Sequence, residues 1–369
     1  MTDTDFEIFL TVPPGLEPTL LEEVRARGFA SPEQIKGGVV IRGGWPDVWR
    51  ANLELRGATK VLARFWSFRA FHLAQLDKRA RKVPWHDILP KNEPVRVDVT
   101  CFKSKIYHAG AATQRIEKAI AEEHGATIAG DAEIRIKVRI DDNMCTFSID
   151  TTGESLHKRG HKEAIGKAPM RETLAALFLR RCGYTGTEPV LDPMCGSGTF
   201  VIEAAEMAMG LQAGRARAFA FEKLANFDAV AFEAMKKAPT GACDLTFYGR
   251  DRNQGVIGMA TANANRAGVG EICNFDTHAI SDLKRPEGPA GLVIVNPPYG
   301  GRIGNKGQLY ALYGSLGKVL KAQFSGWRVG IVTSEAGLAR ATDLTFVETS
   351  PPISHGGLKI RLHRTDPLP

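Results

Sequence analysis

The chain has 369 residues, of which 43% are hydrophobic and 24% are charged, an ordinary balance for a globular protein. This length is enough for two or three domains, and no apolar run reaches the roughly 20 residues that span a membrane. The first residues, Met1–Asp5, lack the basic and apolar regions of a secretory signal. We therefore expect a cytoplasmic protein that does not associate with membranes.

The six cysteines are scattered along the chain. None forms a C-x-x-C pair, and none has a nearby histidine at the spacing of a zinc site. This usage predicts reduced thiols and no metal centre.

The net charge of +7 is concentrated in one early segment. Between Arg56 and Lys118 the sequence has 14 lysines and arginines against 5 aspartates and glutamates. A block of this kind favours a polyanionic partner. A solvated basic face that binds nothing is the alternative.

Residues 1–68 are predicted to form a small α+β domain. Hydrophobic periodicity gives the order β-α-β-α-β, at residues 6–12, 16–28, 39–41, 45–55 and 61–68. The run Pro13-Pro14-Gly15 ends the first strand.

A second domain is predicted over residues 69–155. Its expected elements are a helical stretch from 71, a turn or short helix at 85–90, a strand at 95–99, a helix at 109–124, and paired strands at 134–140 and 144–149. Strict alternation places Arg135, Lys137 and Arg139 on one face of a strand. Such residues are usually solvent-exposed, so this face alone does not establish a binding surface.

The run from Leu191 to Phe200 is predicted to be a strand, a glycine loop and the start of a helix. Gly196 and Gly198 permit backbone angles and a close approach that a Cβ would block. The helix start offers free N–H groups to a ligand, and Asp192 stands at the carboxyl end of its strand, where open α/β sheets bind ligands. Taken alone, a G-x-G run also fits a turn without a ligand.

The remainder is predicted to be a parallel sheet with helices. Strands are expected near 189–192, 245–249, 271–275, 291–295, 328–333 and 358–363, with a helix at 307–324 and a helical insertion or loop at 214–237. The run Asn296-Pro297-Pro298-Tyr299 directly follows the strand at 291–295.

Together, the loop at 192–199 and the Asn296–Tyr299 run resemble the class I S-adenosylmethionine-dependent methyltransferases that modify exocyclic amino groups. The resemblance implies S-adenosylmethionine as the cofactor and a Rossmann-like sheet, with no metal. It also implies that the amine is held at Asn296–Tyr299, with Asn296 bordering the cofactor. The residues implied to hold the methionine part of the cofactor are Asp192, Pro193, Cys195, Gly196, Ser197, Gly198 and Thr199.

The chemistry of an exocyclic amine explains why an N-P-P-Y run suits it. Such an amine is a poor nucleophile because its lone pair is delocalised into the base. The side-chain oxygen of Asn296 and the carbonyl of Pro297 can accept its two hydrogens, and the two prolines stiffen the loop. Tyr299 can stack on a base that has left its helix. Catalysis would then consist mainly of positioning and electrostatics.

Two further acidic residues follow predicted strands. The resemblance assigns Asp251 to the ribose diol of the cofactor, and capping of the helix at 253–267 is the alternative. It places Asp276 beside the adenine, and capping of a turn is the alternative.

The segment before the loop carries a second resemblance. Residues 69–155 resemble a THUMP RNA-binding domain after a ferredoxin-like start, on the basis of Phe102-Lys103-Ser104, the two late strands and Ser155–His161. The runs Leu156–Gly160 and Ala168–Ala175, in which Pro169 opens a helix, resemble bacterial large-subunit rRNA guanine-N2 methyltransferases. That family places this segment against the cofactor pocket, ahead of a methyltransferase domain expected here at 156–369.

The sequence therefore predicts methylation of guanosine N2 in RNA, with 23S rRNA or a pre-ribosomal particle as the partner. A guanosine-N2 methyltransferase of tRNA is the nearest alternative. DNA adenine-N6 or protein glutamine-N5 methylation and a non-catalytic rRNA assembly factor are the others. Some relatives carry a second methyltransferase domain, and this chain ends at Pro369, so we do not expect activity at two sites. The oligomeric state stays open.

Overall fold

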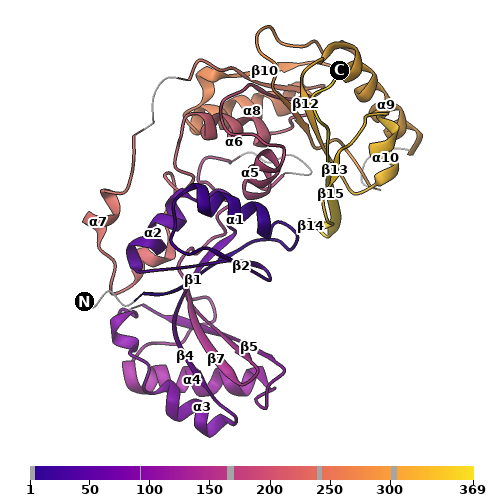
Figure 1. The fold of residues 1–369 in the computed structure, drawn as a ribbon. Helices are drawn as coiled ribbons and strands as arrows, with labels where there is room; N and C mark the ends of the chain where they lie inside the picture. Colours follow the sequence, from indigo (N-terminus) through magenta and orange to yellow (C-terminus); the bar gives the residue numbers. More distant parts are fainter. Residues whose placement is uncertain (1–4, 92, 164–169, 239–242, 301–305) are drawn as a thin grey trace. The chain divides into compact units, whose positions relative to one another are not determined.

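The structure, a computed structural model, describes residues 5–91, 93–163, 170–238, 243–300 and 306–369 (Figure 1). Pro169, at which a helix was expected to open, lies outside these residues. The chain divides into two compact units. The first contains Met1–Val12, Leu21–Leu156 and Arg217–Lys236, and the second contains Pro13–Leu20, His157–Ala216 and Lys237–Pro369.

A seven-stranded sheet forms the first unit, in the order β2-β3-β1-β4-β7-β6-β5. Neighbouring strands are antiparallel, except that β5 and β6 are parallel. The strands are β1 (Phe6–Thr11), β2 (Glu33–Ile35), β3 (Gly38–Gly43), β4 (Lys60–Arg69), β5 (Val95–Phe102), β6 (Ile134–Asp141) and β7 (Met144–Asp150). Periodicity missed only β2 among them, because three residues are too few to show alternation.

Strand β4 belongs to both predicted N-terminal domains. One edge of β4 pairs with β1 and the other pairs with β7, with a register shift between Arg64 and Trp66. The hydrogen-bonded ladder therefore continues through the position near residue 68 where the sequence suggested a boundary.

The helices between β1 and β6 follow their sequence signals closely. They are α1 (Glu17–Ala26), α2 (Trp45–Glu54), α3 (Leu73–Ala80) and α4 (Ala109–His124), with a 3-10 turn, η1, at Trp85–Asp87. Helix α4 buries Ala112, Ile116, Ala119 and Ile120, the spacing of one helical face. His108 caps its start by accepting from Ala111 N at 3.0 Å, and Gly125 ends it at φ +77°.

A tight turn fixes the β6–β7 hairpin. Asp142 and Asn143 have φ values of +47° and +61°, a left-handed conformation that these two residue types tolerate. The predicted hairpin is confirmed. The placement of Arg135, Lys137 and Arg139 on one face is also confirmed, since these residues alternate with buried Ile134, Ile136, Val138 and Ile140.

The segment Arg217–Lys236 belongs to the first unit, although it follows the glycine loop in the chain. It contains a 3-10 turn, η2 (Ala220–Lys223), and the short helix α7 (Ala229–Glu233). The rings of Phe221 and Phe227 lie 6.3 and 5.6 Å from the ring of Trp49 on α2. Aromatic packing of this kind explains why a stretch expected to be an insertion or loop contacts the N-terminal sheet domain.

The described residues of the second unit form eight strands, in the order β10-β9-β8-β11-β12-β15-β13, with β14 paired to β15. They are β8 (Val190–Asp192), β9 (Phe247–Asp251), β10 (Cys273–Thr277), β11 (Leu292–Val295), β12 (Arg328–Thr333), β13 (Glu348–Thr349), β14 (Ile353–His355) and β15 (Leu358–Arg364). The expectation of a wholly parallel sheet is wrong at its end, because β15 pairs antiparallel with β12, β13 and β14. A hairpin at Gly356 and Gly357, both with positive φ, reverses the chain there.

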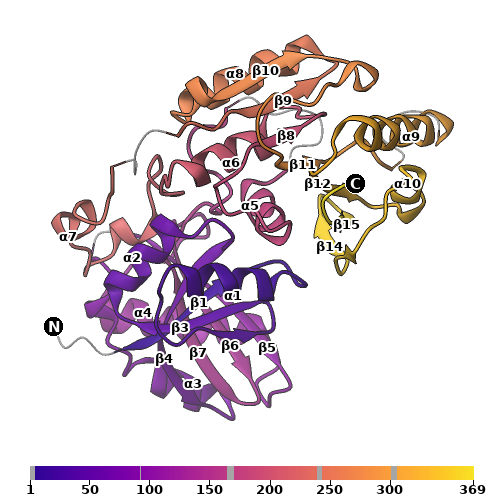
Figure 2. The ribbon, with the colours of Figure 1, turned by 45° about the horizontal axis from the view of Figure 1, so that its top comes forward.

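Helices cover both faces of this sheet (Figures 1 and 2). They are α5 (Glu172–Arg181), α6 (Thr199–Ala208), α8 (Gln254–Arg266), α9 (Lys306–Gln323) and α10 (Ala336–Ala341), with 3-10 turns η3 (Gly270–Ile272) and η4 (Ile280–Asp282). Val293 and Val295 of β11 join one core cluster with Leu309 and Tyr313 of α9. All four residues of β11 are buried, which accounts for its uninterrupted apolar sequence. No described helix is long and apolar enough to cross a membrane.

Two glycines of α9 give a matched test of this packing. A Cβ on Gly317 would lie 1.8 Å from the carbonyl oxygen of Thr342, whereas a Cβ on Gly314 would lie 3.6 Å from that of Ala341. We predict that Gly317→Ala destabilises the protein by about 1–3 kcal/mol through overpacking. Gly314→Ala should instead stabilise it by up to about 1 kcal/mol, because alanine is the better helix former. Urea denaturation measures both, and equal effects would contradict this packing.

Candidate active site at the carboxyl edge of the second sheet

The candidate site lies where neighbouring parallel strands end. Strand β8 pairs with β9 on one side and with β11 on the other, and β10 extends the sheet beyond β9. Parallel pairing brings Asp192, Asp251, Asp276 and Asn296 to the same edge of the sheet. The position of β8 between β9 and β11 is the switch point at which open α/β sheets bind ligands.

The glycine loop between β8 and α6 is held close to β9. Cys195 N donates to the carbonyl of Arg250 at 2.8 Å, and Gly198 N donates to the carbonyl of Cys195 at 2.8 Å. Gly198 has φ +85°, and a Cβ there would lie 3.1 to 3.2 Å from side chains of α6, α8 and β10. Gly196 has φ +51° and nothing within 4 Å of the place of a Cβ, so the loop leaves space above it.

Asp192 is a buried carboxylate held by the turn that follows its strand. Its side chain is 2% exposed, and its Oδ1 accepts from Met194 N at 3.0 Å. Burial raises its pKa well above the ordinary value of 3.8, and the negative charge of Asp251 raises it further. A ligand that is cationic or donates hydrogen bonds would stabilise the ionised carboxylate and offset the free-energy cost of its burial.

Asp251 joins the end of β9 to the glycine loop. Its Oδ2 accepts from Gly196 N at 3.1 Å, and its Oδ1 accepts from Asn253 N at 3.0 Å. The alternative role of Asp251 as the cap of α8 is wrong, because Asn253 caps that helix by accepting from Gly255 N at 2.9 Å. Each carboxylate oxygen keeps a lone pair for a ligand hydroxyl.

Asp276 is the exposed member of the group. Its side chain is 59% exposed, its Oδ2 lies 2.9 Å from His278 Nε2, and its Oδ1 accepts from Thr277 N at 2.8 Å. The hydrogen bond to His278 is the main reason that the pKa of Asp276 is lowered. The Thr277 contact is the local turn bond that the sequence allowed as an alternative, and it leaves the carboxylate open to solvent.

The Asn296–Tyr299 run contains an unsatisfied acceptor. Asn296 Oδ1 is buried and has no hydrogen-bond partner within the described structure. Buried polar atoms are nearly always paired, so an orphaned oxygen at a strand end indicates a missing donor. Pro297 is buried, and Tyr299 is partly buried against the core cluster that contains α9.

Glu335 supports this run, although no motif in the sequence marked it as a site residue. Its Oε1 accepts from Gly300 N at 3.2 Å, and it directly precedes α10. The available signal was its place just after the strand at 328–333, on the same edge as the other site residues.

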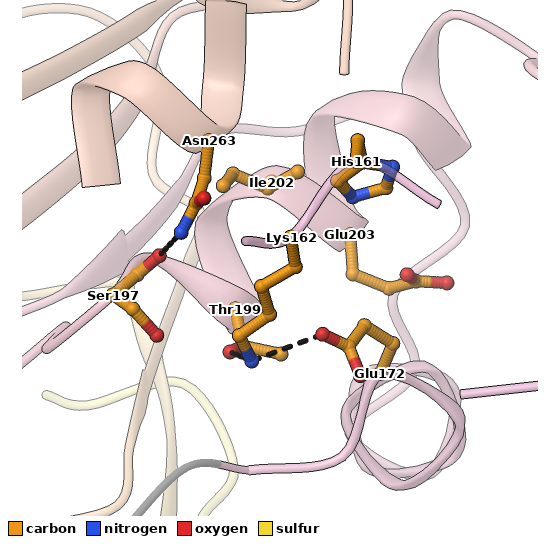
Figure 3. Close-up of a pocket in the computed structure, with 8 residues that line it drawn as sticks. All are labelled: His161, Lys162, Glu172, Ser197, Thr199, Ile202, Glu203 and Asn263. Atoms are coloured by element: carbon orange, nitrogen blue, oxygen red, sulfur yellow. Dashed lines mark hydrogen bonds and ion pairs between the residues drawn. The ribbon is translucent and has the colours of Figure 1, made fainter. Parts of the chain in front are cut away.

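The segment at 157–163 packs behind the glycine loop (Figure 3). Arg159 and Glu203 form an ion pair at 3.0 Å whose side chains are 1% and 2% exposed. Lys162 Nζ lies 2.9 Å from Glu172 Oε1 and donates to Thr199 Oγ1 at 2.8 Å. These contacts surround a small pocket lined by His161, Lys162, Glu172, Ser197, Thr199, Ile202, Glu203 and Asn263.

Taken together, the edge offers a glycine loop with open space, a helix start, carboxylates of unlike environment and an orphaned amide oxygen. These features fit a ligand that has both a charged amino-acid end and a nucleoside end. They also fit an amine whose hydrogens need acceptors beside that ligand.

Comparison with known families agrees with this geometry. Residues 7–62 match the RlmL ferredoxin-like domain, and residues 71–150 match the THUMP domain. Residues 159–352, more than half of the chain, match the RMKL-like methyltransferase domain. The chain belongs to this methyltransferase family. The resemblance inferred from the sequence and the predicted fold class are confirmed.

Curated relatives are about one-third identical to this chain over the aligned residues. The "Ribosomal RNA large subunit methyltransferase K/L" of Psychromonas ingrahamii is 33% identical over 346 residues, which cover 89% of this chain and 46% of that protein. The protein of the same name from Syntrophotalea carbinolica is 32% identical, over 92% of this chain and 50% of its own length. The chain therefore spans about half the length of these relatives.

A solved structure shares the whole architecture. The crystal structure of a possible methylase from Clostridium difficile 630 superposes with a TM-score of 0.87 at 27% identity, over 99% of each chain. The match includes both compact units.

The burial of Asp192 predicts a stability effect with a definite sign. A raised pKa means that the folded state binds the proton more tightly, so the stabilisation is present at low pH and is lost as pH rises through the folded pKa. Asp192→Asn mimics the protonated form, so we predict a higher Tm than wild type at pH 8 and a difference that closes as the pH falls toward 4. Thermal melts of the ligand-free protein at several pH values measure this.

Asp276→Asn is the matched control, because its pKa is lowered rather than raised. Its contribution to stability is present at neutral pH and is lost as the pH falls, so this variant should give no gain at pH 8. A gain of the same sign in both variants would contradict the assignment of a desolvated carboxylate to Asp192.

Proposed function

We propose that this protein transfers a methyl group from S-adenosylmethionine to N2 of a guanosine in RNA, and that 23S rRNA is the substrate. The observation that carries the proposal is the buried, unpartnered Oδ1 of Asn296 at the carboxyl end of β11, beside the switch point of the sheet. The hydrogens of an exocyclic amine would supply the donor that this oxygen lacks.

The cofactor would be held along the edge of the sheet. The glycine loop and Asp192 suit its amino-acid end, Asp251 suits the ribose diol, and Asp276 suits the adenine. When bound, this cofactor supplies a methyl group on a positively charged sulfur. Positive charge nearby would favour the ionised form of the buried Asp192 carboxyl.

The protein's own contribution to the reaction is to orient the amine. Asn296 Oδ1 and the carbonyl of Pro297 would accept the two amine hydrogens, which turns the nitrogen lone pair toward the cofactor side of the edge. Gly300, anchored on Glu335, fixes the far end of the run. The rate enhancement then comes from positioning and from preorganised dipoles.

The first unit supports RNA as the substrate class. Its matched THUMP segment covers residues 71–150, and the basic side chains of Arg135, Lys137 and Arg139 stand on the side of β6 opposite its buried residues. The names of the curated relatives favour large-subunit rRNA over tRNA. A cytoplasmic location and binding to a pre-ribosomal particle follow from the same proposal.

Asn296→Ala tests the catalytic part. We predict that methyl transfer from labelled S-adenosylmethionine to unmodified 23S rRNA yields N2-methylguanosine, and that the variant lowers kcat by about 10²–10³-fold. RNA affinity should stay within about twofold, because the change removes one acceptor and no positive charge. Asn274→Ala, at an exposed position on β10, is the control and should retain activity.

The methyl-transfer assay, together with the cellular role of Asn296→Ala, distinguishes the alternatives. Product in bulk tRNA alone would refute 23S rRNA as the substrate while leaving the chemistry intact. N6-methyladenine in DNA would refute RNA. An unchanged cellular role for Asn296→Ala would refute catalysis in favour of an assembly factor.

The RNA-binding face makes a second prediction. Arg135→Ala combined with Lys137→Ala should weaken binding to all RNA sequences alike. It should also flatten the slope of log K against log salt by about 1 for each phosphate that the protein no longer neutralises. Lys321→Ala, on α9 of the second unit, is the control for removal of a surface charge. An unchanged salt slope in the double variant would show that this face does not bind RNA.

A further inference from the structure

Lys162 is a nearly buried lysine directly behind the predicted cofactor loop. Its side chain is 12% exposed. Nζ lies 2.9 Å from Glu172 Oε1, 2.8 Å from Thr199 Oγ1 and 3.3 Å from the carbonyl oxygen of Met170. Figure 3 shows the side chain of Lys162 ending beside Thr199, at the start of α6.

These three contacts use all the hydrogens of the ammonium group. A lysine ammonium has three N–H donors and no acceptor. Lys162 therefore has no donor left for a ligand, and any effect on a ligand must pass through Glu172, Met170 or Thr199. Its charge is matched by Glu172, so the effect does not come from net charge.

The contact with Thr199 sets the direction of a hydrogen bond. A hydroxyl has one hydrogen and can accept through its oxygen lone pairs. Because the ammonium cannot accept, Thr199 Oγ1 must be the acceptor in this bond. The single hydroxyl hydrogen is then directed to a different acceptor.

The acceptor that suits this position is anionic. Thr199 is the first residue of α6, where unpaired backbone N–H groups and the helix dipole favour negative charge. The cofactor's amino-acid end carries one carboxylate, whereas its ammonium suits Asp192.

Neighbouring contacts keep the lysine in place. Arg266 Nε on α8 donates to the carbonyl of His161 at 2.8 Å, and the buried Arg159–Glu203 pair fastens the same segment to α6. Glu172, at the start of α5, is 6% exposed and so holds its own side-chain position.

We propose that Lys162 is a positioning residue that fixes the Thr199 hydroxyl as a donor to the carboxylate of the bound cofactor. The inference rests on the proposed function, since it names a role in holding S-adenosylmethionine. It predicts an effect specific to ligands that have the amino-acid end.

Two ligands and two backgrounds test this role. S-adenosylhomocysteine has the amino-acid end, and 5′-methylthioadenosine has the same adenosine without it. Lys162→Met alone would leave the Glu172 carboxylate buried and unpaired, which can unfold the protein. The comparison is therefore the wild-type protein, in which Lys162 donates to Thr199, against Lys162→Met/Glu172→Gln, which removes this donor and leaves no unpaired buried charge.

Isothermal titration calorimetry should give a Kd for S-adenosylhomocysteine about ten- to thirtyfold weaker in the double variant than in the wild-type protein. The Kd for 5′-methylthioadenosine should stay within about twofold. In a Thr199→Val background the Lys162→Met/Glu172→Gln change should have no further effect, because the hydroxyl through which Lys162 acts is gone.

The outcomes distinguish failure of the proposed role of Lys162 from failure of the proposed function. An equal rise in Kd for both ligands would overturn the positioning role and would show that Lys162 only stabilises the local structure. Weakening that persists in the Thr199→Val background would also overturn it. Failure of the wild-type protein to bind either ligand would instead overturn the proposed function.

Discussion

The site depends on one constraint, the parallel pairing of β8 with β9 on one side and β11 on the other. This arrangement brings an acidic residue, a glycine loop and the Asn296 run to a single edge, although the two ends of the set are far apart in the sequence. It also leaves Asp192 desolvated and Asn296 Oδ1 unpaired. Native proteins retain unfavourably buried polar groups of this kind where a bound ligand supplies their missing partners.

Two ion pairs that are buried or nearly buried support the glycine loop. Arg159 faces Glu203, and Lys162 faces Glu172, so neither the arginine nor the lysine is buried alone. A buried charge without a partner costs several kcal/mol, which makes the pairing mandatory once the segment is docked. The short run before the methyltransferase sheet therefore supports the glycine loop and is more than a linker.

In the first unit, the two predicted N-terminal domains share one sheet. Strand β4 carries ladders to both predicted N-terminal domains. The aromatic residues of Arg217–Lys236 return from beyond the glycine loop to pack on Trp49. Removing either element would expose apolar surface on its neighbour, so we expect the ferredoxin-like and THUMP parts to unfold together.

The sequence by itself determined the local features: the bounds of α4, the β6–β7 hairpin, the glycine loop and the Asn296–Tyr299 run. Each has a signal within a few residues, such as a helical period, a left-handed turn or a strand followed by glycines. Tertiary structure decided the antiparallel direction of β15, the cap of α8 at Asn253, and the supporting roles of Glu335 and Lys162. These features depend on which distant segments pair, and residues that are neighbours in the sequence do not determine the energy of such contacts.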